Sequence, residues 1–160
     1  MSVTDFRAAL SRFASGVTVV TVRDADGVDH GMTVSAFTSL SLDPPLVLAC
    51  LDRVATVLPH LLAAERFGVS ILAEGQDVIS ARFAEQGVVR FDGVAVSRAA
   101  GGPVLIDGAV AHLVCRRVAE FPGGDHVIVV GAIESARALG ERPLLYAMRQ
   151  YGSFTPDSGR

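Results

Sequence analysis

The sequence predicts a mainly β protein, built as a closed or nearly closed antiparallel barrel with a few short helices inserted. Three observations favour this fold class. Runs of β-branched residues recur along the chain, turn-forming Gly, Asp and Pro separate them, and the helical segments are short and do not alternate regularly with the strands. A barrel is favoured over an open sheet because closure removes exposed strand edges.

The first elements predicted are a helix and a hairpin. Residues 1–16 have the pattern of a short amphipathic helix capped by Thr4 or Asp5. Residues 17–23 are dominated by β-branched side chains, and a turn at 24–27 leads to a partner strand at 28–37. The apolar face of the helix consists of Phe6, Leu10 and Phe13.

Later segments continue as strands with two short helices. A helix at 56–64 is expected to begin at its cap Thr56, with Pro59 tolerated in the first turn, and another helix is expected at 76–84. The inward side chains of this second helix are predicted to be Val78, Ile79 and Phe83. Strands are expected at 46–51, 67–72, 93–97, 109–121 and 126–138, a loop at 87–92 and a hairpin turn at 122–125.

Length and composition predict a single domain over residues 1–160 with a substantial core, since folding at this size buries roughly 68–70% of the surface of the unfolded chain. Half of the residues are hydrophobic and only 19% are charged, so we expect some apolar side chains to be buried at a subunit interface. All 14 basic residues are Arg, and they are scattered, which argues against nucleic acid as a partner.

The expected location is the cytoplasm. No apolar run approaches the ~18 residues of a membrane span, and the N-terminus lacks the layout of a secretory signal. Cys50 and Cys115 lie in apolar strand patterns without a CxxC motif, which favours reduced core thiols.

The segment 31–48 carries the clearest functional signal, because it sets small hydroxyl residues among apolar ones before a Pro-Pro break. Such an edge suits a nucleotide-like ligand that is part flat ring and part phosphate, although an ordinary strand with an exposed hydroxyl face has the same pattern. Phe37 or Leu40 would provide apolar contact for the ring. The candidate hydroxyls are those of Thr33, Ser35 and Ser39, and the candidate amides are those of Val34, Ala36 and Leu40.

A second candidate is the strand-to-helix corner at 52–56. Amides at a helix N-terminus bind phosphate, and the guanidinium of Arg53 adds a two-pronged donor. The alternative is that Thr56 is only a cap and Arg53 only a solvated charge.

The remaining candidates are His126, beside glycines at the start of a strand, and the C-terminal block 143–152 with its Tyr and Arg residues. His126 is placed to meet a second ligand, or is a surface histidine near a turn. His112 and His60 have no neighbour in sequence that would orient them. Because no pair of His or Cys residues has metal-ligand spacing, we predict no metal site. The chain also lacks a nucleophile triad, P-loop and GxGxxG, so an enzyme of this kind relies on a cofactor.

Taken in order, the blocks FRAALSRFASGVTVVT, GMTVSAFTSLSLDPPLVLACLDRVATVLPHL, RFGVSILAEGQDVISARFA, RFDG, GDHVIVVGAIES and PLLYAMRQYGSF resemble the short-chain flavin reductases over nearly the whole chain. These are the reductase partners of two-component flavin-dependent monooxygenases. The resemblance implies an FMN-binding split barrel, Greek-key-like and dimeric. It also implies that the protein transfers a hydride from NADH or NADPH to FMN or FAD, and that reduced flavin leaves for a separate oxygenase.

The resemblance also implies roles for matching positions. The flavin ring and ribityl chain are expected at Thr33, Val34, Ser35, Ala36, Ser39 and Leu40. The phosphate end is expected at Asp52, Arg53, Val54 and Thr56, with Phe83 and Ala84 as a further wall. His126 is expected beside the nicotinamide as a positioning group in catalysis, with Arg149, Tyr151 and Gly152 in the pyridine-nucleotide pocket.

One departure from the family pattern is the stretch Val54-Ala55-Thr56, where many members carry an additional hydroxyl. This suggests weaker phosphate binding and a flavin that acts as a diffusible substrate. The sequence does not decide whether the flavin is FMN or FAD, whether the hydride donor is NADH or NADPH, or which oxygenase is the partner. The alternative function is a split barrel that binds flavin or another flat cofactor, such as haem or deazaflavin, without turnover.

Overall fold

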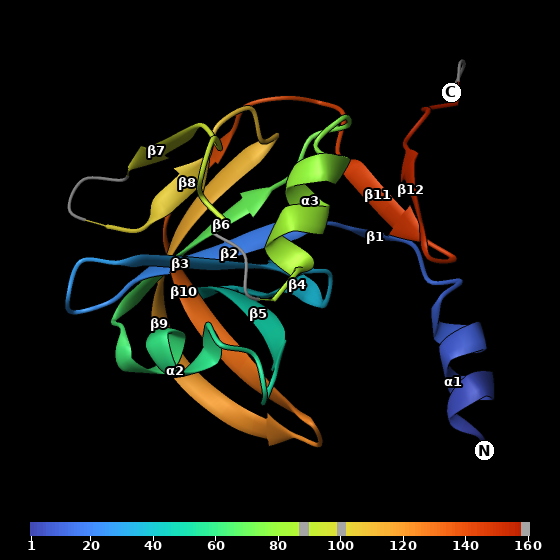
Figure 1. The fold of residues 1–160 in the computed structure, drawn as a ribbon, viewed down its shortest axis with the longest axis horizontal. Coiled ribbons are helices and arrows are strands. Elements are labelled where there is room, and N and C mark those ends of the chain that lie inside the picture. The colour runs from blue at the N-terminus through green and yellow to red at the C-terminus, as the bar shows by residue number, and fades with distance from the viewer. Residues whose placement is uncertain (87–89, 99–101, 158–160) are drawn as a thin grey trace.

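The computed structural model describes residues 1–86, 90–98 and 102–157. A curved antiparallel sheet in the strand order β3-β2-β6-β9-β10-β5-β4 dominates it and wraps around an apolar interior, as the split-barrel expectation requires (Figure 1). The strands of this sheet are β2 (Thr18–Arg23), β3 (Asp29–Val34), β4 (Phe37–Leu42), β5 (Pro45–Asp52), β6 (Arg66–Ile71), β9 (Ala111–Gly123) and β10 (His126–Ala138).

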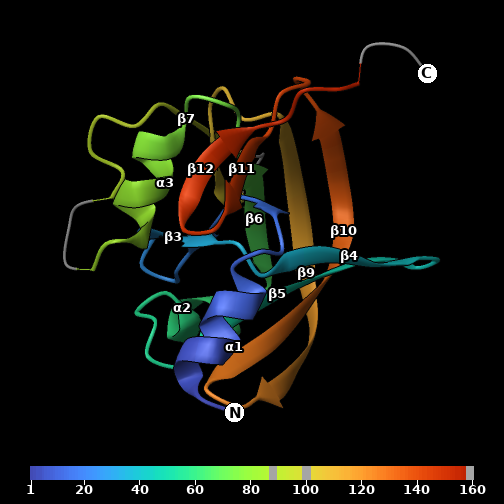
Figure 2. The same ribbon diagram turned by 90° about the vertical axis from the view of Figure 1, so that its right-hand side faces the viewer.

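In the described part of the chain, three helices and two small sheets surround the barrel (Figure 2). The helices are α1 (Val3–Leu10), α2 (Leu58–Ala63) and α3 (Asp77–Ala84). The small sheets consist of β1 (Ser15–Gly16), β11 (Leu144–Ala147) and β12 (Gln150–Ser153), and of β7 (Val96–Arg98) and β8 (Val104–Ile106). No helix among the described residues is both long and apolar enough to cross a membrane.

Strand β2 is buried on both faces, so one strand joins two cores. Val20 and Val22 face the barrel interior. Val19 points to the opposite face and packs with Phe83 of α3 and Leu144 of β11 in a second apolar cluster. A strand covered on both faces has few polar positions, which explains why residues 17–23 are dominated by β-branched side chains.

Three buried hydroxyls, those of Thr18, Thr21 and Ser70, tie neighbouring strands and sheets together. The Thr18 hydroxyl donates to the Val34 carbonyl at 2.6 Å, and the Thr21 hydroxyl donates to the Val104 carbonyl of β8. The Ser70 hydroxyl accepts from the Ile106 amide at 2.9 Å. Among the described residues, every buried side-chain nitrogen or oxygen has a hydrogen-bond partner. Buried hydroxyls therefore cost little here, because each is paired.

The partner strand expected at 28–37 is wrong in its extent. Strand β3 ends at Val34, a bend follows at Ser35 and Ala36, and β4 then pairs with β5 rather than continuing the hairpin. The Ala36 carbonyl accepts from the Cys50 amide at 2.9 Å, which fastens the bend to β5. The long hydroxyl-rich segment is thus split over two strands at opposite ends of the sheet order.

The expected helix starts are also corrected. Helix α1 begins at Val3, because the Ser2 hydroxyl accepts from the Asp5 amide at 3.0 Å while the Asp5 carboxylate reaches back to Ser2. Thr56 does not cap α2, whose N-cap is Val57 without a side-chain hydrogen bond. Tertiary packing of Leu58 and Leu61 therefore replaces local capping as the cause of α2.

In α3 the predicted inward face is partly wrong. Phe83 is fully buried and Ile79 packs against the second core, as expected, but Val78 is 68% exposed. The buried position of the first turns belongs to Ser80 instead. Because the buried Ser80 is polar, the spacing of apolar residues in this short helix does not indicate its buried face correctly.

Several short strands were not expected. Strand β7 starts at Val96 rather than 93, and β1, β8, β11 and β12 had no separate prediction. Of the loop expected at 87–92, residues 87–89 lie outside the described part, while residues 90–93 form a turn. Strands of two to four residues are too short for alternation to be visible in sequence.

The hairpin β9–β10 confirms the two long strands expected at its position, although the turn is shorter than predicted. His126 pairs with Gly123, so Gly124 and Asp125 alone form the turn, and Gly124 has a φ of +72°. Glycine adopts a positive φ at low steric cost, which explains why a glycine occupies position 124 in this turn.

Cys115 is fully buried, and Cys50 is half-buried; both are free thiols, as expected. Burial, with a smaller contribution from the charge of Glu134, raises the pKa of the Cys115 thiol to about 12. The Cys115 side chain is therefore a packing element rather than a nucleophile.

We expect Gly131→Ala to lower the free energy of unfolding by about 1–3 kcal/mol, as overpacking of a tight core does. A Cβ at Gly131 would lie 2.5 Å from the ring of Phe67 and 2.9 Å from Cβ of Cys115. Urea denaturation followed by far-UV circular dichroism measures the change. The matched control is Gly16→Ala, because a Cβ at Gly16 meets no atom within 4 Å. Equal stability of the two variants would contradict this account of the close approach.

Candidate functional site

A polar-rimmed cleft of about 140 Å³ lies between β3, the approach to α2, and α3. Four of the predicted site residues line it: Thr33, Thr56, Phe83 and Ala84. The sequence expectation that the hydroxyl segment and the 52–56 corner meet is thus met by Thr33 and Thr56. The further lining residues are Met32, Ala55, Val57, Gln86 and Arg90.

Of the five lining residues that the sequence analysis did not predict, Arg90 is the one that carries a charge. Its guanidinium donates to the Gly31 carbonyl at 3.0 Å, and to the Glu85 carbonyl at 3.0 Å from Nε and 2.6 Å from Nη2. These carbonyl acceptors fix the orientation of the Arg90 guanidinium without neutralising its charge. Arg90 forms no ion pair within the described residues. In the sequence, Arg90 precedes the aromatic Phe91 in a predicted loop, but no neighbouring residue indicates that this loop lies beside the cleft.

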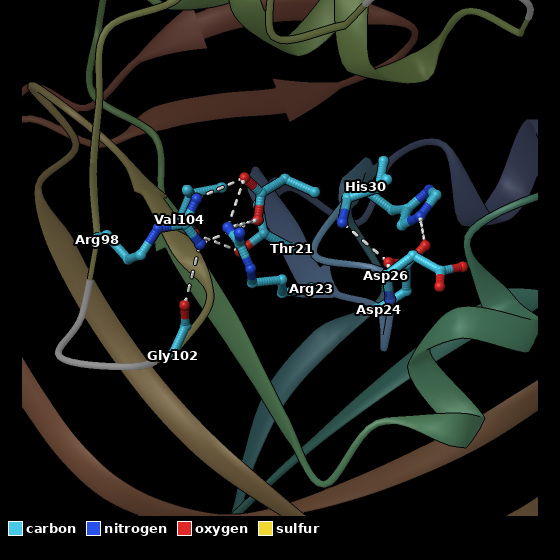
Figure 3. A network of polar contacts seen from close by, with 10 residues as sticks. Thr21, Arg23, Asp24, Asp26, His30, Arg98, Gly102 and Val104 are labelled. Atoms are coloured by element: carbon cyan, nitrogen blue, oxygen red, sulfur yellow. Dashed lines mark hydrogen bonds and ion pairs between the residues drawn. The ribbon is translucent and has the colours of Figure 1, made fainter.

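On its other side Arg90 lines a larger cavity of about 440 Å³. The rim of this cavity includes Asp29, which pairs with Arg98 at 2.6 Å and with Arg23 at 3.4 Å. Figure 3 shows the two arginines. Asp29 therefore neutralises much of the charge of Arg98, and Arg90 remains the cation shared by both hollows.

The apolar wall of the cleft depends on a close approach of α3 to β3. The Phe83 ring is fully buried and meets the Phe91 ring edge-on, with centroids 5.0 Å apart. A Cβ at Gly31 would lie 2.9 Å from the Phe83 ring, so only glycine gives β3 and α3 this spacing.

A buried hydroxyl links Thr33 to the C-terminal block. The Thr33 hydroxyl donates to the Ser80 carbonyl at 2.6 Å, and the Ser80 hydroxyl lies 2.9 Å from the Tyr151 hydroxyl. Ser80 is 1% exposed, so this link is shielded from water. The proton of Thr33 is thereby committed to the Ser80 carbonyl, so this hydroxyl can offer a ligand only an acceptor.

Asp52, Arg53 and His126 form a second group at the β9–β10 turn. Arg53 donates from its amide to the Asp125 carbonyl at 3.0 Å and from Nε to the Gly124 carbonyl at 2.8 Å. Asp52 lies opposite His126 in the sheet and accepts from the Val54 amide at 3.0 Å. Arg53 thus holds the turn in place, and within the described residues the Nη groups of its exposed side chain make no hydrogen bond.

His126 is held by a carboxylate at the mouth of β10. Its Nδ1 lies 2.7 Å from the Asp125 carboxylate, and this hydrogen bond lowers the pKa of Asp125. A fixed Nδ1 partner leaves Nε2 as the group available to a ligand.

The other predicted site residues do not line the cleft. Ser35 and Ala36 occupy the exposed bend after β3, Ser39 and Leu40 lie on β4, and Val54 is 75% exposed. These positions border solvent in one chain.

Of the C-terminal candidates, Tyr151 reaches the cleft region through Ser80, whereas Gly152 lies on β12 with open space around it. Arg149 occupies the β11–β12 turn at a φ of +62°, beside Met148 at +50°. Two non-glycine residues at positive φ are unusual and mark a strained two-residue turn.

The expectation that His60 and His112 lack orienting neighbours is wrong. The His112 Nε2 lies 2.7 Å from the Ile106 carbonyl, and the His60 ring stacks on His30 with centroids 3.6 Å apart. His30 is far from His60 in sequence, and Ile106, six residues before His112, belongs to another strand, so the sequence pattern gave no sign of either contact.

Fold and site together define a split-barrel protein with a cleft whose cation, hydroxyl and aromatic wall suit a phosphate attached to a flat ring. Comparison with known proteins agrees. The sequence profile of the flavin reductase like domain matches residues 10–155. The chain belongs to this family.

Several relatives are similar over most of their length. The reductase component of 4-hydroxyphenylacetate 3-monooxygenase from Thermus thermophilus is 46% identical over 148 residues, 91% of this chain and 93% of that protein. An NADH-dependent flavin reductase from Rhodococcus is 43% identical over 146 residues, 88% of this chain and 80% of that protein. A solved structure of a Streptomyces globisporus NADH:FAD oxidoreductase with NAD and FAD fragments has a TM-score of 0.92 and 37% identity, covering 98% of this chain and 94% of that one.

Arg149→Gly is expected to stabilise the protein by about 1 kcal/mol, since glycine removes the steric cost of the left-handed conformation. Thermal unfolding followed by circular dichroism measures the gain. The same variant is expected to raise the KM for NADH if Arg149 contributes to the nucleotide pocket. A loss of stability on this substitution would contradict the account of strain in the turn.

Proposed function

We propose that this protein is an NAD(P)H:flavin oxidoreductase, which reduces FMN or FAD and supplies the reduced flavin to a separate oxygenase. The observation that carries the proposal is the cleft of Thr56, Phe83 and Arg90 in a chain that matches flavin reductases over nearly its full length. The relatives include the reductase component of an oxygenase system, which supports the same role here.

The residues of the cleft fit a flavin phosphate chemically. Arg90 offers a fixed guanidinium whose neutral partners leave its charge available, and such groups bind phosphate strongly. Thr56 adds an exposed hydroxyl, and Phe83 an apolar wall. When bound, flavin accepts a hydride from the reduced nicotinamide and thus supplies the redox chemistry.

The chain's own contribution is position and electrostatics. Arg90 and Thr56 would hold the phosphate end, while Thr33, aligned by Ser80, presents an acceptor to the ligand. His126, aligned by Asp125, would position the nicotinamide through its Nε2. No general base is required of these residues, because hydride transfer moves no proton to a side chain; holding the two reactants in contact is the main source of rate.

We further propose that the active form is a homodimer. A cleft of about 140 Å³ is smaller than the roughly 300–1,000 Å³ of sites that enclose cofactors. Helix α1 buries none of its residues and carries Phe6 and Leu10, which are 49% and 54% exposed, with Phe13 after it at 79%. A second copy that covers this helix would complete the cofactor site and hide the apolar face.

A cytoplasmic location is part of the proposal, and free cysteines support it. A binding protein without turnover is the competing function. It would use the same cleft but would not oxidise NADH or NADPH.

The test is NADH and NADPH consumption, followed at 340 nm with FMN, FAD or riboflavin, with and without oxygen. Flavin-dependent oxidation is expected, with retained turnover in the absence of oxygen until flavin is exhausted. A folded protein that binds flavin but oxidises neither nucleotide would overturn the reductase proposal in favour of the binding module.

Arg90→Ala is expected to raise the dissociation constant for FMN about tenfold or more, because a hydrogen bond to a charged group contributes about 1.5–3 kcal/mol. Quenching of flavin fluorescence measures binding. Arg90→Lys keeps the positive charge but replaces the planar guanidinium by an ammonium group. Its dissociation constant for FMN should therefore lie between those of the wild type and Arg90→Ala.

The matched control is Arg142→Ala, which removes an exposed guanidinium paired with Glu74. Its FMN affinity should equal that of the wild type. Equal losses in the Arg90 and Arg142 variants would show that net charge, not the cleft, governs binding.

A further inference from the structure

Three side chains that are far apart in sequence meet beside the barrel. Asp24 follows β2, His30 belongs to β3, and His60 belongs to α2 (Figure 3 shows Asp24 and His30). Their ligand atoms all lie within 4.8 Å of one another, the one such group of His, Cys, Asp and Glu within the described residues. We propose that this cluster binds a divalent transition-metal ion such as Zn²⁺, Co²⁺ or Ni²⁺.

The carboxylate is held in place by its own turn. Oδ1 of Asp24 accepts from the Asp26 amide at 3.0 Å and from the Val28 amide at 2.8 Å. This leaves Oδ2 for the histidines, with His30 Nε2 at 2.7 Å and His60 Nδ1 at 3.6 Å. Hydrogen bonds to one oxygen that orient the other are the arrangement that tunes carboxylate ligands of metals.

The carboxylate is ionised at neutral pH. The hydrogen bond with His30 and the two amides lower the pKa of Asp24. The nearby Arg23 forms its ion pair with Asp29, so the carboxylate of Asp24 is not neutralised by Arg23. An anionic oxygen with two imidazoles is a ligand set for zinc and its neighbours, whereas calcium and magnesium prefer oxygen ligands throughout.

Metal binding requires a modest rearrangement of one ring. Ligand atoms about 2.0–2.1 Å from a tetrahedral ion lie about 3.4 Å from one another, so the present 2.7 Å hydrogen bond must lengthen. The rings of His30 and His60 are stacked with an interplanar angle of 13°, and their lone pairs therefore do not converge. Metal binding would therefore turn the ring of His60, whose side chain is 38% exposed, away from His30 and toward the ion.

Such an ion would tie the β2–β3 turn to α2. Helix α2 follows directly on Thr56 and Val57, which line the cleft. Three protein ligands leave one position of a tetrahedral ion for water. The inference does not depend on the proposed reductase activity, since it concerns a separate group of side chains.

The test uses full-length protein without an affinity tag, titrated with Co²⁺ and then Zn²⁺. We expect one ion per chain, visible absorption from bound Co²⁺ that Zn²⁺ abolishes, and a melting temperature that rises with metal concentration. Acidification should weaken binding, because protons compete with the ion for the imidazole nitrogens.

His60→Ala and Asp24→Asn are each expected to weaken binding at least tenfold, with circular dichroism confirming that the variants fold. The matched control is His126→Ala, which removes a different His–Asp pair, also at 2.7 Å. Retention of the Co²⁺ spectrum in that control supports the assignment. No saturable binding to the wild type, binding unchanged in His60→Ala, or binding lost in His126→Ala would each overturn it.

Discussion

The burial of strand β2 on both faces is the constraint on which the rest of the structure depends. Its even-numbered valines close the barrel interior with Phe67, while Val19 forms a second core with Phe83 and Leu144. Because one strand belongs to both cores, the barrel and the layer outside it cannot pack independently. The position of each β3 side chain relative to α3 is therefore fixed by the register of the sheet. The shape of the cleft between β3 and α3 is fixed in the same way.

The cleft lies where these two layers meet, and its polar groups reflect that position. Ser80 is buried between them and uses its carbonyl for Thr33 and its hydroxyl for Tyr151. Gly31 lets the layers approach, and Arg90 closes the rim by bonding to the backbone of both. A fully satisfied polar network of this kind is rigid, which suits a site whose contribution is alignment rather than acid–base chemistry.

Two further features lie outside this core. The apolar side chains of α1 are about half exposed in one chain, and the cleft is small. The stacked histidines join the β2–β3 turn to α2 through one carboxylate. Helix α2 follows directly on Thr56 and Val57, which line the cleft, so an ion bound to the histidines would act close to the site.

The sequence by itself determined the strand class, the β9–β10 hairpin, the reduced thiols and the family, because alternation, turn residues and the order of motifs are local properties. It also predicted that Thr33, Thr56 and Phe83 belong to one site. Only the tertiary structure decided that Arg90 joins them, that the Thr33 proton is committed to Ser80, and that Asp24, His30 and His60 meet. Each of these contacts depends on which strands become neighbours and in which register, and no short-range pattern carries that information.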